Sequence, residues 1–374
     1  MPGLRASRRC QTAVAPCQAE TVLRYRNETR DRRNVEKETS VLDHISLFCS
    51  VAGLTILLTV APLVAGRNDD RIRPYEANPR YWQYKGEPLL LLGGSKDDNL
   101  FQIPDLAEHL DAMKAAGANY IRNTMSDRKD LGFEVYPYKQ VGEDMYDLDQ
   151  WNEEYWYKLK FFFDETGKRD IIVHLTLWDH FDLSGYGRFS RHPLNPENNI
   201  NWAPGTIKNA TDYYGGSLAT NNEPVLGYQH RFVDRVISLS AGYGHIFYNI
   251  ANESGLGADW DNYWALYIKE AAARHGREIH VTTMLFTPDN SVRRVMNYRN
   301  IYSFAEVSQN NQDALGPVGK KHWENLLFWR KMIAMSNEGP MPVTRNGINT
   351  TAMTGGVRNA SLPSIRAITA LTWQ

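Results

Sequence analysis

The sequence predicts an α/β fold, a (β/α)8 TIM barrel, from three observations. Seven short apolar runs alternate with segments of helical spacing between residues 88 and 344. The first run, residues 88–94, is continuous and ends in two glycines, which is typical of a strand buried on both faces of a parallel sheet. No G-x-G-x-x-G sequence follows it, and this disfavours a doubly wound nucleotide-binding sheet. The alternation of strand and helix therefore favours the barrel.

The individual elements follow in a regular order. Residues 103–116 have helical spacing, with Pro104 in the first turn and Gly117 just past the end. The other predicted strands are residues 119–125, 171–178, 245–251, 279–286, 301–307 and 341–344. The other predicted helices are residues 151–165, 225–239, 263–274 and 323–335, with a short turn or helix near Val292. Only residues 350–354 remain for an eighth strand, and residues 364–373 have helical spacing, so we expect the barrel to be incomplete or irregular there.

Composition limits the classes of function. The 374 residues are 42% hydrophobic and 11% aromatic, enough for the core of one large barrel domain. The net charge of −1 argues against a nucleic-acid partner, because binding phosphate backbones requires a basic surface. The three cysteines, Cys10, Cys17 and Cys49, all precede the predicted barrel, which excludes a disulfide, a thiol nucleophile or a thiolate metal site within it.

The N-terminal part predicts export. Residues 45–66 contain no charged side chain, follow a basic stretch and end in Val64-Ala65-Gly66, small residues that suit a signal peptidase. We expect cleavage after Gly66; the alternative is a retained helix that anchors the chain in a membrane. Residues 1–44 are polar and arginine-rich and are expected to be disordered or to precede the true start, which leaves residues 71–374 as the catalytic domain. The protein would then be periplasmic, extracellular or anchored facing outward. The sequence leaves its oligomeric state open.

Polar side chains end the predicted strands, and in a TIM barrel these positions form one rim around the active site. The rim predicted in this way is acidic and contains amides, a cation and aromatic groups. Its members are Asp97, Asp98, Asn99, Arg122, Asn123, Trp178, Asp179, His180, Asp182, Asn252, Glu253, Asp289, Glu306, Gln309 and Asn310.

A long connection, residues 183–224, follows the third predicted strand. It is rich in asparagine, glycine and aromatic residues, including Tyr186, Trp202, Tyr213 and Tyr214. Connections of this length in a compact domain are usually functional. Aromatic faces can stack on sugar rings, so the loop suits a carbohydrate cleft; the alternative is a surface loop packed by its own aromatic side chains.

Several of these segments together resemble a known family. The matching segments are residues 91–95 (LLGGS), 98–102 (DNLFQ), 120–125 (YIRNTM), 178–182 (WDHFD), 252–253 (NE), 308–311 (SQNN) and 322–323 (HW). From about residue 81 to residue 346 the chain resembles the TIM-barrel glycoside hydrolases, in particular exported cellulase-like hydrolases of environmental bacteria. The resemblance implies a carbohydrate substrate, with Glu253 as the general acid/base and Arg122 as the arginine that orients the nucleophile. It also implies substrate contacts from Asp98, Arg122, Asn123, Trp178, Asp179, His180, Asn252, Gln309 and Asn310.

The second carboxylate is where the sequence departs from the family pattern. Retaining hydrolysis needs a second carboxyl group about 5 Å from the first, and the superfamily supplies it at the end of strand seven. That strand ends here in Arg345-Asn346, and Glu338 precedes the strand, at the opposite end of the barrel. Glu306 is therefore the preferred second catalytic residue, with Asp179 behind it. A structural acid paired with an arginine is the alternative interpretation of Glu306.

The predicted function is thus cleavage of O-glycosidic bonds in a poly- or oligosaccharide by carboxylate acid/base catalysis. No cofactor is expected, and no H-x-H, H-E-x-x-H or G-x-S-x-G sequence supports a metal site or a serine hydrolase. If the nucleophile is missing, the protein is an inverting enzyme or a non-catalytic carbohydrate-binding protein on a degenerate barrel.

Overall fold

A computed structural model describes residues 70–94, 96–185, 187–307, 320–337 and 339–344. All of them belong to one compact unit, residues 64–374. The strands are β1 (Arg73–Pro74), β2 (Trp82–Tyr84), β3 (Glu87–Leu89), β4 (Tyr120–Thr124), β5 (Tyr138–Gly142), β6 (Met145–Trp151), β7 (Ile172–Trp178), β8 (Ile246–Ala251), β9 (Val281–Thr282), β10 (Ala305–Glu306) and β11 (Val343–Thr344). The α-helices are α2 (Leu106–Ala115), α3 (Glu153–Lys168), α4 (His180–Ser184), α5 (Ser217–Ala219), α6 (Glu223–Ser240), α7 (Ala258–Arg274), α8 (Pro288–Asn297) and α9 (Lys320–Ala334).

The central parallel sheet follows the order of the sequence. Strands β4, β7, β8 and β9 lie side by side in that order, and all their pairs are parallel. A parallel bridge joins Gly93 to Tyr120 on one side of this sheet. On the other side Ser303 donates its backbone N–H to the carbonyl oxygen of Val281 over 2.9 Å, and β10 then pairs with β11 in parallel. Seven successive strand segments are therefore connected as in a TIM barrel, which confirms the predicted α/β class; the candidate eighth strand, residues 350–354, lies outside the described residues.

The first and second strand segments meet at Gly93 because this residue has no side chain. A Cβ atom at position 93 would lie 2.0 Å from the backbone oxygen of Tyr120. The neighbouring backbone bond runs from the N–H of Asn119 to the oxygen of Leu92, at 2.7 Å. Glycine thus permits the close approach of the two backbones at this point.

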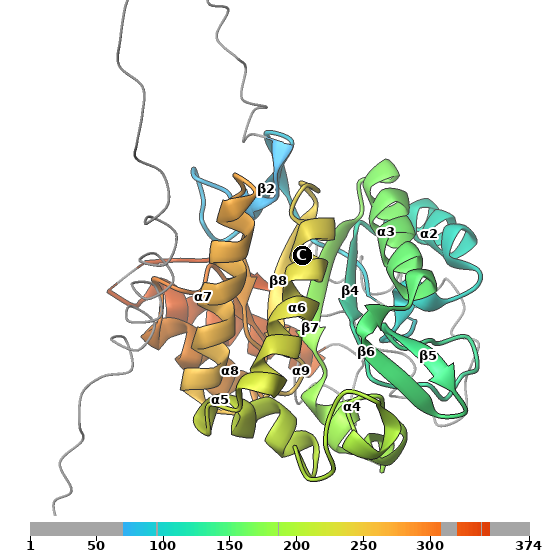
Figure 1. The fold of residues 1–374 in the computed structure, drawn as a ribbon. Coiled ribbons are helices and arrows are strands. Elements are labelled where there is room, and N and C mark those ends of the chain that lie inside the picture. Colours follow the sequence, from blue (N-terminus) through green and yellow to red (C-terminus); the bar gives the residue numbers. More distant parts are fainter. Residues whose placement is uncertain (1–69, 95, 186, 308–319, 338, 345–374) are drawn as a thin grey trace, which may run out of the picture. The chain divides into compact units, whose positions relative to one another are not determined.

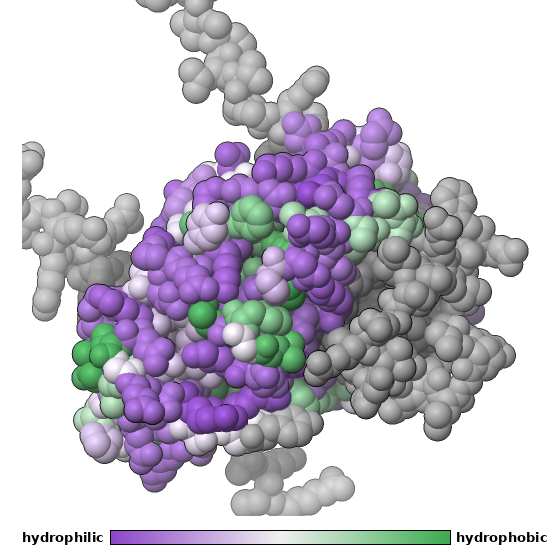
Figure 2. Space-filling model, turned by 90° about the vertical axis from the view of Figure 1, so that its right-hand side faces the viewer, coloured by the Kyte–Doolittle hydropathy of each residue, from purple (hydrophilic) through white to green (hydrophobic). Residues whose placement is uncertain are grey.

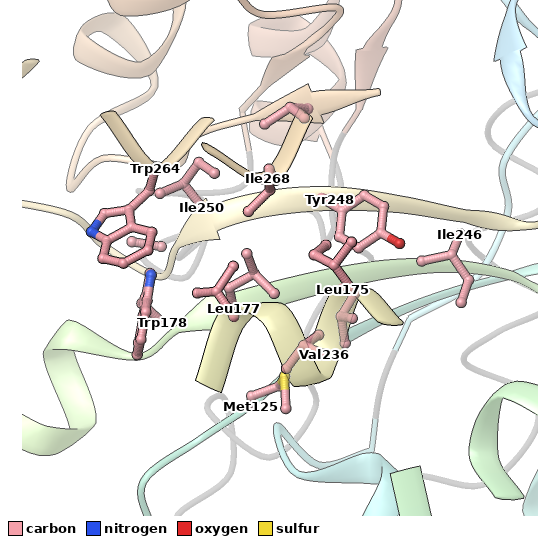
Figure 3. Packing of buried hydrophobic residues seen from close by; sticks show 14 of the residues in the cluster. Met125, Leu175, Leu177, Trp178, Val236, Ile246, Tyr248, Ile250, Trp264 and Ile268 are labelled. Carbon is pink, nitrogen blue, oxygen red and sulfur yellow. The ribbon is translucent and has the colours of Figure 1, made fainter. Parts of the chain in front are cut away.

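Helices α6 and α7 cover one face of the sheet, in front of β7 and β8 (Figure 1). Both present an apolar stripe to the strands: Val236 of α6 and Ile268 of α7 are completely buried. Figure 3 shows these two side chains among Leu175, Leu177, Tyr248 and Ile250 of the strands. Strands β4, β7 and β8 are buried at every position, which explains why β7 and β8 are mainly apolar, whereas β4 also buries Arg122 and Asn123.

The first predicted strand differs from the structure. Residues 88–94 do not form one buried strand, because Glu87–Leu89 pairs instead with β2 in a small antiparallel sheet, β1-β2-β3. Leu90 consequently remains 42% exposed, and the chain joins the parallel sheet only at Gly93. The apolar run is therefore divided between two sheets.

A β-hairpin between the second and third barrel strands was missing from the prediction. Strands β5 and β6 pair antiparallel through a turn in which Asp144 has φ of 49°. Trp151, predicted to begin a helix, ends β6; α3 begins two residues later because the side chain of Asn152 accepts the N–H of Glu154. The side of the molecule that carries this hairpin is mostly hydrophilic, with hydrophobic groups in small separate patches (Figure 2).

The predicted N-terminal segments, residues 1–44 and 45–66, lie outside the described residues, as does the predicted helix 364–373. Within the part of the chain that the structure describes, no helix is long and apolar enough to cross a membrane.

Candidate active site

Glu253 lies two residues beyond the last residue of β8, at the carboxyl end of the parallel sheet. Its backbone has φ of 51°, the left-handed region that non-glycine residues rarely adopt. The strands hold the turn from both sides: Asn252 donates its N–H to the oxygen of Trp178 over 2.8 Å, and Ser254 donates to Met284 over 2.8 Å. The half-buried carboxyl group of Glu253 is thus presented by a strained turn between two anchored residues.

Asn252 connects two charged residues below this turn. Its Oδ1 accepts a hydrogen bond from Nη1 of Arg122 over 3.2 Å, and its Nδ2 donates to Oδ1 of Asp179 over 3.2 Å. Arg122 of β4 and Asp179, the residue after β7, therefore meet through the amide side chain of Asn252, the residue after β8. Asn252 is 5% exposed, so water is largely excluded as a competing hydrogen-bond partner of its side chain.

Arg122 extends the network to the loop after the first strand segment. Its Nη2 lies 3.6 Å from Oδ1 of Asp98, and Arg128 binds the other oxygen of the same carboxylate over 2.5 Å. Arg128 also donates its Nε to Asp182 over 2.5 Å. The structure thus joins the predicted residues Asp98, Arg122, Asp179 and Asn252 in one network, and Asn252 is the residue before Glu253.

Asp179 and Asp182 form a buried carboxyl pair of unequal acidity. Asp179 is completely buried, and its pKa lies well above the usual range because burial and the neighbouring Asp182 disfavour its charged form. Burial also acts against the charge of Asp182, but a hydrogen bond with Asp179 and the charge of Arg128 lower the pKa of Asp182 overall. Arg188 adds a further contact to Asp182 at 3.0 Å. The geometry therefore favours a neutral Asp179 beside an ionised Asp182.

Glu306, the preferred second catalytic residue, lies deeper in the sheet. Its carboxyl group is completely buried and accepts a hydrogen bond from Oγ1 of Thr344 over 3.1 Å. Oε2 of Glu306 is 3.6 Å from Nδ1 of His174, which pairs with Arg122 in the middle of the sheet. Tyr120 bonds the same His174 nitrogen at 2.9 Å. Glu306 therefore belongs to a buried polar group at the level of His174, four residues before the end of β7.

Two predicted substrate-binding residues face away from this network. Asn123 follows Arg122 on β4 and so points to the opposite side of the sheet, where its Oδ1 accepts the N–H of Phe101 over 2.9 Å. Trp178 is 4% exposed, and its ring lies 5.5 Å from that of Trp264 (Figure 3). The ring of Phe232 is 5.1 Å away. Both side chains are buried in this structure, and their predicted role in substrate binding stays a prediction.

The aromatic side chains of the long connection are also internal. Trp202, Tyr213 and Tyr214 are 6%, 1% and 1% exposed, so their faces are covered by the protein. The expectation that they stack on a sugar is replaced by the alternative of a loop packed by its own aromatic residues; Tyr186 lies outside the described residues. His180, the first residue of α4, packs its ring 5.4 Å from that of Tyr214, and burial lowers its pKa.

The structure adds residues that the sequence did not single out. Arg128 connects Asp98 with Asp182, and Ser126 donates a hydrogen bond to Asp182. Asp127 lies 3.0 Å from Nε2 of His192 and accepts a hydrogen bond from Tyr214 over 3.1 Å. A polar Ser-Asp-Arg run immediately after an apolar strand was the signal available for these positions.

Three predicted residues, Gln309, Asn310 and Glu338, lie outside the described residues. Among the residues that the structure does describe, no group of three or more histidine, cysteine or carboxylate side chains is arranged to hold a metal ion.

No family model matches the sequence, and no curated protein matches it. Solved structures similar to this chain include a glycoside hydrolase family 5 mannosidase from Rhizomucor miehei, with 17% identity over 74% of this chain and 72% of that one, at a TM-score of 0.49. An endo-1,4-β-mannanase from the same organism has 14% identity over 73% of this chain and 80% of that one, at a TM-score of 0.48. A β-mannanase from the blue mussel Mytilus edulis has 11% identity over 81% and 97% of the two chains, at a TM-score of 0.45.

Proposed function

We propose that the protein is a glycoside hydrolase that cleaves O-glycosidic bonds of a poly- or oligosaccharide, with Glu253 as the general acid/base. One observation carries the proposal: Glu253 is held at the carboxyl end of β8 in a left-handed backbone conformation, next to an Asn252 that binds both Arg122 and Asp179. Strain of this kind persists where the surrounding structure determines it, and it concentrates at active sites. The end of a parallel strand is also where α/β barrels place their chemistry.

In the proposed reaction Glu253 donates its proton to the glycosidic oxygen as the C–O bond breaks. The second carboxylate then either attacks the anomeric carbon or activates the water that does so, and water supplies the new hydroxyl group in both cases. Arg122 and Asn252 would fix the position of the reacting groups through the contacts described above.

For the second carboxylate we retain Glu306 and Asp179 as candidates, each with a distinct supporting observation. Glu306 accepts a hydrogen bond from Thr344 and lies near His174. Asp179 is joined directly to Asn252, the neighbour of Glu253, but its raised pKa suits a proton donor better than a nucleophile. Glu306→Gln and Asp179→Asn separate them: with an activated aryl glycoside, azide that takes the place of a missing second carboxylate forms a glycosyl azide of inverted anomeric configuration, whereas azide that attacks a glycosyl-enzyme intermediate forms one of retained configuration.

The decisive test of the proposal is Glu253→Gln in the full chain. We expect turnover of an activated aryl glycoside or polysaccharide to fall by at least about 10²-fold, the usual contribution of a positioned acid/base, while the thermal unfolding midpoint changes little. Glu270→Gln, the same substitution on the exposed side of α7, is the matched control and should leave turnover unchanged. Unchanged turnover in Glu253→Gln would contradict the assignment of Glu253 as the general acid/base.

A binding protein without catalysis is the second candidate. The complete burial of both Asp179 and Glu306 favours it, since a hydrolase needs a second carboxyl group that reaches the sugar. Oligosaccharide binding without turnover, in wild-type protein and in Glu253→Gln alike, would establish this alternative.

We also propose that the protein is exported, on the basis of residues 45–66 and the basic stretch before them. Cell fractionation of the full chain in a bacterial host, with N-terminal sequencing of the product, tests this. Retention of the intact chain in the cytosol would contradict it.

A further inference from the structure

A cleft with charged walls opens at the same end of the sheet as Glu253. We propose that it binds an anionic substituent, a carboxylate or a sulfate ester, on the carbohydrate that the protein acts on. This inference rests on the proposed function and narrows its substrate to an acidic saccharide.

The cleft has a volume of about 190 Å³ and is formed by three separate loops. Lys129, Asp130 and Tyr136 come from the segment after β4, and Asp144 and Tyr146 come from the β5–β6 hairpin. Arg188 and Arg191 come from the short helix Arg188–Arg191 that follows α4. Pockets for drug-sized ligands measure roughly 300–1,000 Å³, so this cleft suits a smaller unit such as a single sugar residue.

The cleft belongs to the carboxyl end of the parallel strands. Two of its three walls are the loops that directly follow β4 and β7, which is where the ligands of such barrels bind. Arg188 connects it to the network around Glu253, because its Nη1 donates to Asp182 over 3.0 Å and Asp182 packs against Asp179. A saccharide chain that reaches Glu253 can therefore place a neighbouring unit in the cleft.

The charges of the lining leave one cation in excess. Arg188 is engaged with Asp182 at 3.0 Å and with Asp130 at 3.6 Å. Among the described residues, neither Lys129 nor Arg191 forms an ion pair with a carboxylate.

Asp144 is the remaining carboxylate of the lining. It sits on the hairpin turn and forms no ion pair with any described residue. The two cations Lys129 and Arg191 and the anion Asp144 together carry one net positive charge. One carboxylate or sulfate group would neutralise this charge.

The floor of the cleft favours a fixed anion position. Tyr136 and Tyr146 are 8% and 2% exposed and pack edge to face with ring centroids 5.7 Å apart. Nζ of Lys129 lies 5.3 Å from the centre of the Tyr136 ring, which directs the ammonium group over the floor. Because the covered tyrosine rings leave little face for stacking, recognition in this cleft depends on charge.

The test uses matched saccharides that differ only in charge. Binding to the full chain carrying Glu253→Gln is measured by calorimetry for trigalacturonate and its methyl ester, and for a κ-carrageenan tetrasaccharide and its desulfated form. We expect one acidic member to bind at least about tenfold more tightly than its neutral partner, with the preference shrinking as salt is added. The pair that shows the preference identifies carboxylate or sulfate as the source.

Substitution of the two free cations completes the test. Lys129→Gln/Arg191→Gln should remove the preference for the acidic member and leave binding of the neutral one within about twofold. Lys114→Gln/Arg277→Gln, exposed cations at the opposite end of the strands, is the charge-matched control and should keep the preference. Equal binding of acidic and neutral members, no binding of either pair, or a preference that survives Lys129→Gln/Arg191→Gln each overturns the inference.

The outcome is separable from that of the proposed function. Hydrolysis of neutral saccharides without any preference for acidic ones leaves the function standing and removes the inference. If Lys129→Gln/Arg191→Gln abolishes a preference for acidic saccharides, but the wild-type protein shows no turnover, the inference stands and the proposed function is removed.

Discussion

Asn252 donates its side-chain amide to the carboxyl group of Asp179 over 3.2 Å, and this contact joins the residue before Glu253 to a buried acid pair. Asp179 accepts a second hydrogen bond from the backbone N–H of Asp182 over 3.1 Å. The cations near the pair contact Asp182 rather than Asp179. The two acids therefore differ in charge because of their partners, although both are buried.

Substitution of the two acids by Asn should consequently change the free energy of unfolding in opposite directions. Asp179→Asn replaces a group that is already neutral in the folded state and removes the cost of protonating it on folding, so we expect the free energy of unfolding at pH 7 to increase. Asp182→Asn removes the carboxylate that Arg128 and Arg188 share, while Asp98 and Asp130 still pair with these arginines, and we expect the loss of the charged hydrogen bonds to cost roughly 1.5–3 kcal/mol. Urea unfolding of both variants measures the difference.

The pH dependence of the same variants supplies the control. Because the folded pKa of Asp179 is raised, the folded state holds a proton that the unfolded state releases, so this group lowers stability as pH rises above about 4. Asp179→Asn should flatten that part of the profile. Similar losses of stability in both variants would show that Asp179 is ionised.

The backbone at Glu253 gives a second prediction. Since φ of 51° is costly for a residue with a Cβ atom, Glu253→Gly should be more stable than Glu253→Ala by about 1 kcal/mol. The same pair at Glu270, within α7, should show the opposite order by about 1 kcal/mol, because glycine is unfavourable inside a helix. Thermal or denaturant unfolding of the four variants measures these differences in stability. If the Ala variant is the more stable one at both positions, the turn at Glu253 relaxes when the residue is replaced.

His245 gives a third prediction, on acid stability. Burial lowers its pKa to about 4, and its Nε2 bonds Oγ1 of Thr166 at 3.0 Å. The unfolded state, with a pKa near 6.5, binds the proton first, so stability is complete above about pH 6.5 and declines as pH falls toward 4. The loss attributable to His245 is about 3 kcal/mol across this window.

Unfolding free energies measured between pH 7 and pH 4 test this loss. His245→Gln should show a shallower decline than the wild-type protein. His275→Gln, at an exposed position after α7, is the control and should follow the wild-type curve. Parallel curves for His245→Gln and the wild type would assign the acid sensitivity to other groups.

Much of the fold could be predicted because the central strands are buried on both sides. Strands β4, β7 and β8 match the predicted residues 119–125, 171–178 and 245–251 within two residues. Helix α6 also matches, since Pro224 starts it and its stripe faces the sheet. The β5–β6 hairpin and the small antiparallel sheet were missed, because their pairing depends on partners that local periodicity does not reveal.

The site was predictable only where the direction of a side chain follows from its neighbours. A strand end predicts that a residue lies near the rim, but alternation sends Arg122 toward Asn252 and Asn123 toward Phe101. When both faces of a strand are buried, the sequence does not show which of two successive side chains points toward the site. The ion pairs of Arg128 were equally inaccessible, because they depend on how a loop folds back over the strand ends.

Gly93 lies outside the candidate site, yet it determines how the site is assembled. The bridge from Gly93 to Tyr120 sets the alignment of the chain that carries Asp98, five residues later, against the strand that carries Arg122, two residues after Tyr120. A slip of one residue would bring Leu92 or Gly94 to Tyr120 and shift Asp98 by about 3.3 Å, enough to break its contact with Arg122. Leu92 cannot take the position, because its Cβ would meet the Tyr120 oxygen. A glycine outside the candidate site thus excludes one misaligned assembly of this end of the sheet, and a side chain introduced there would damage both the fold and the site.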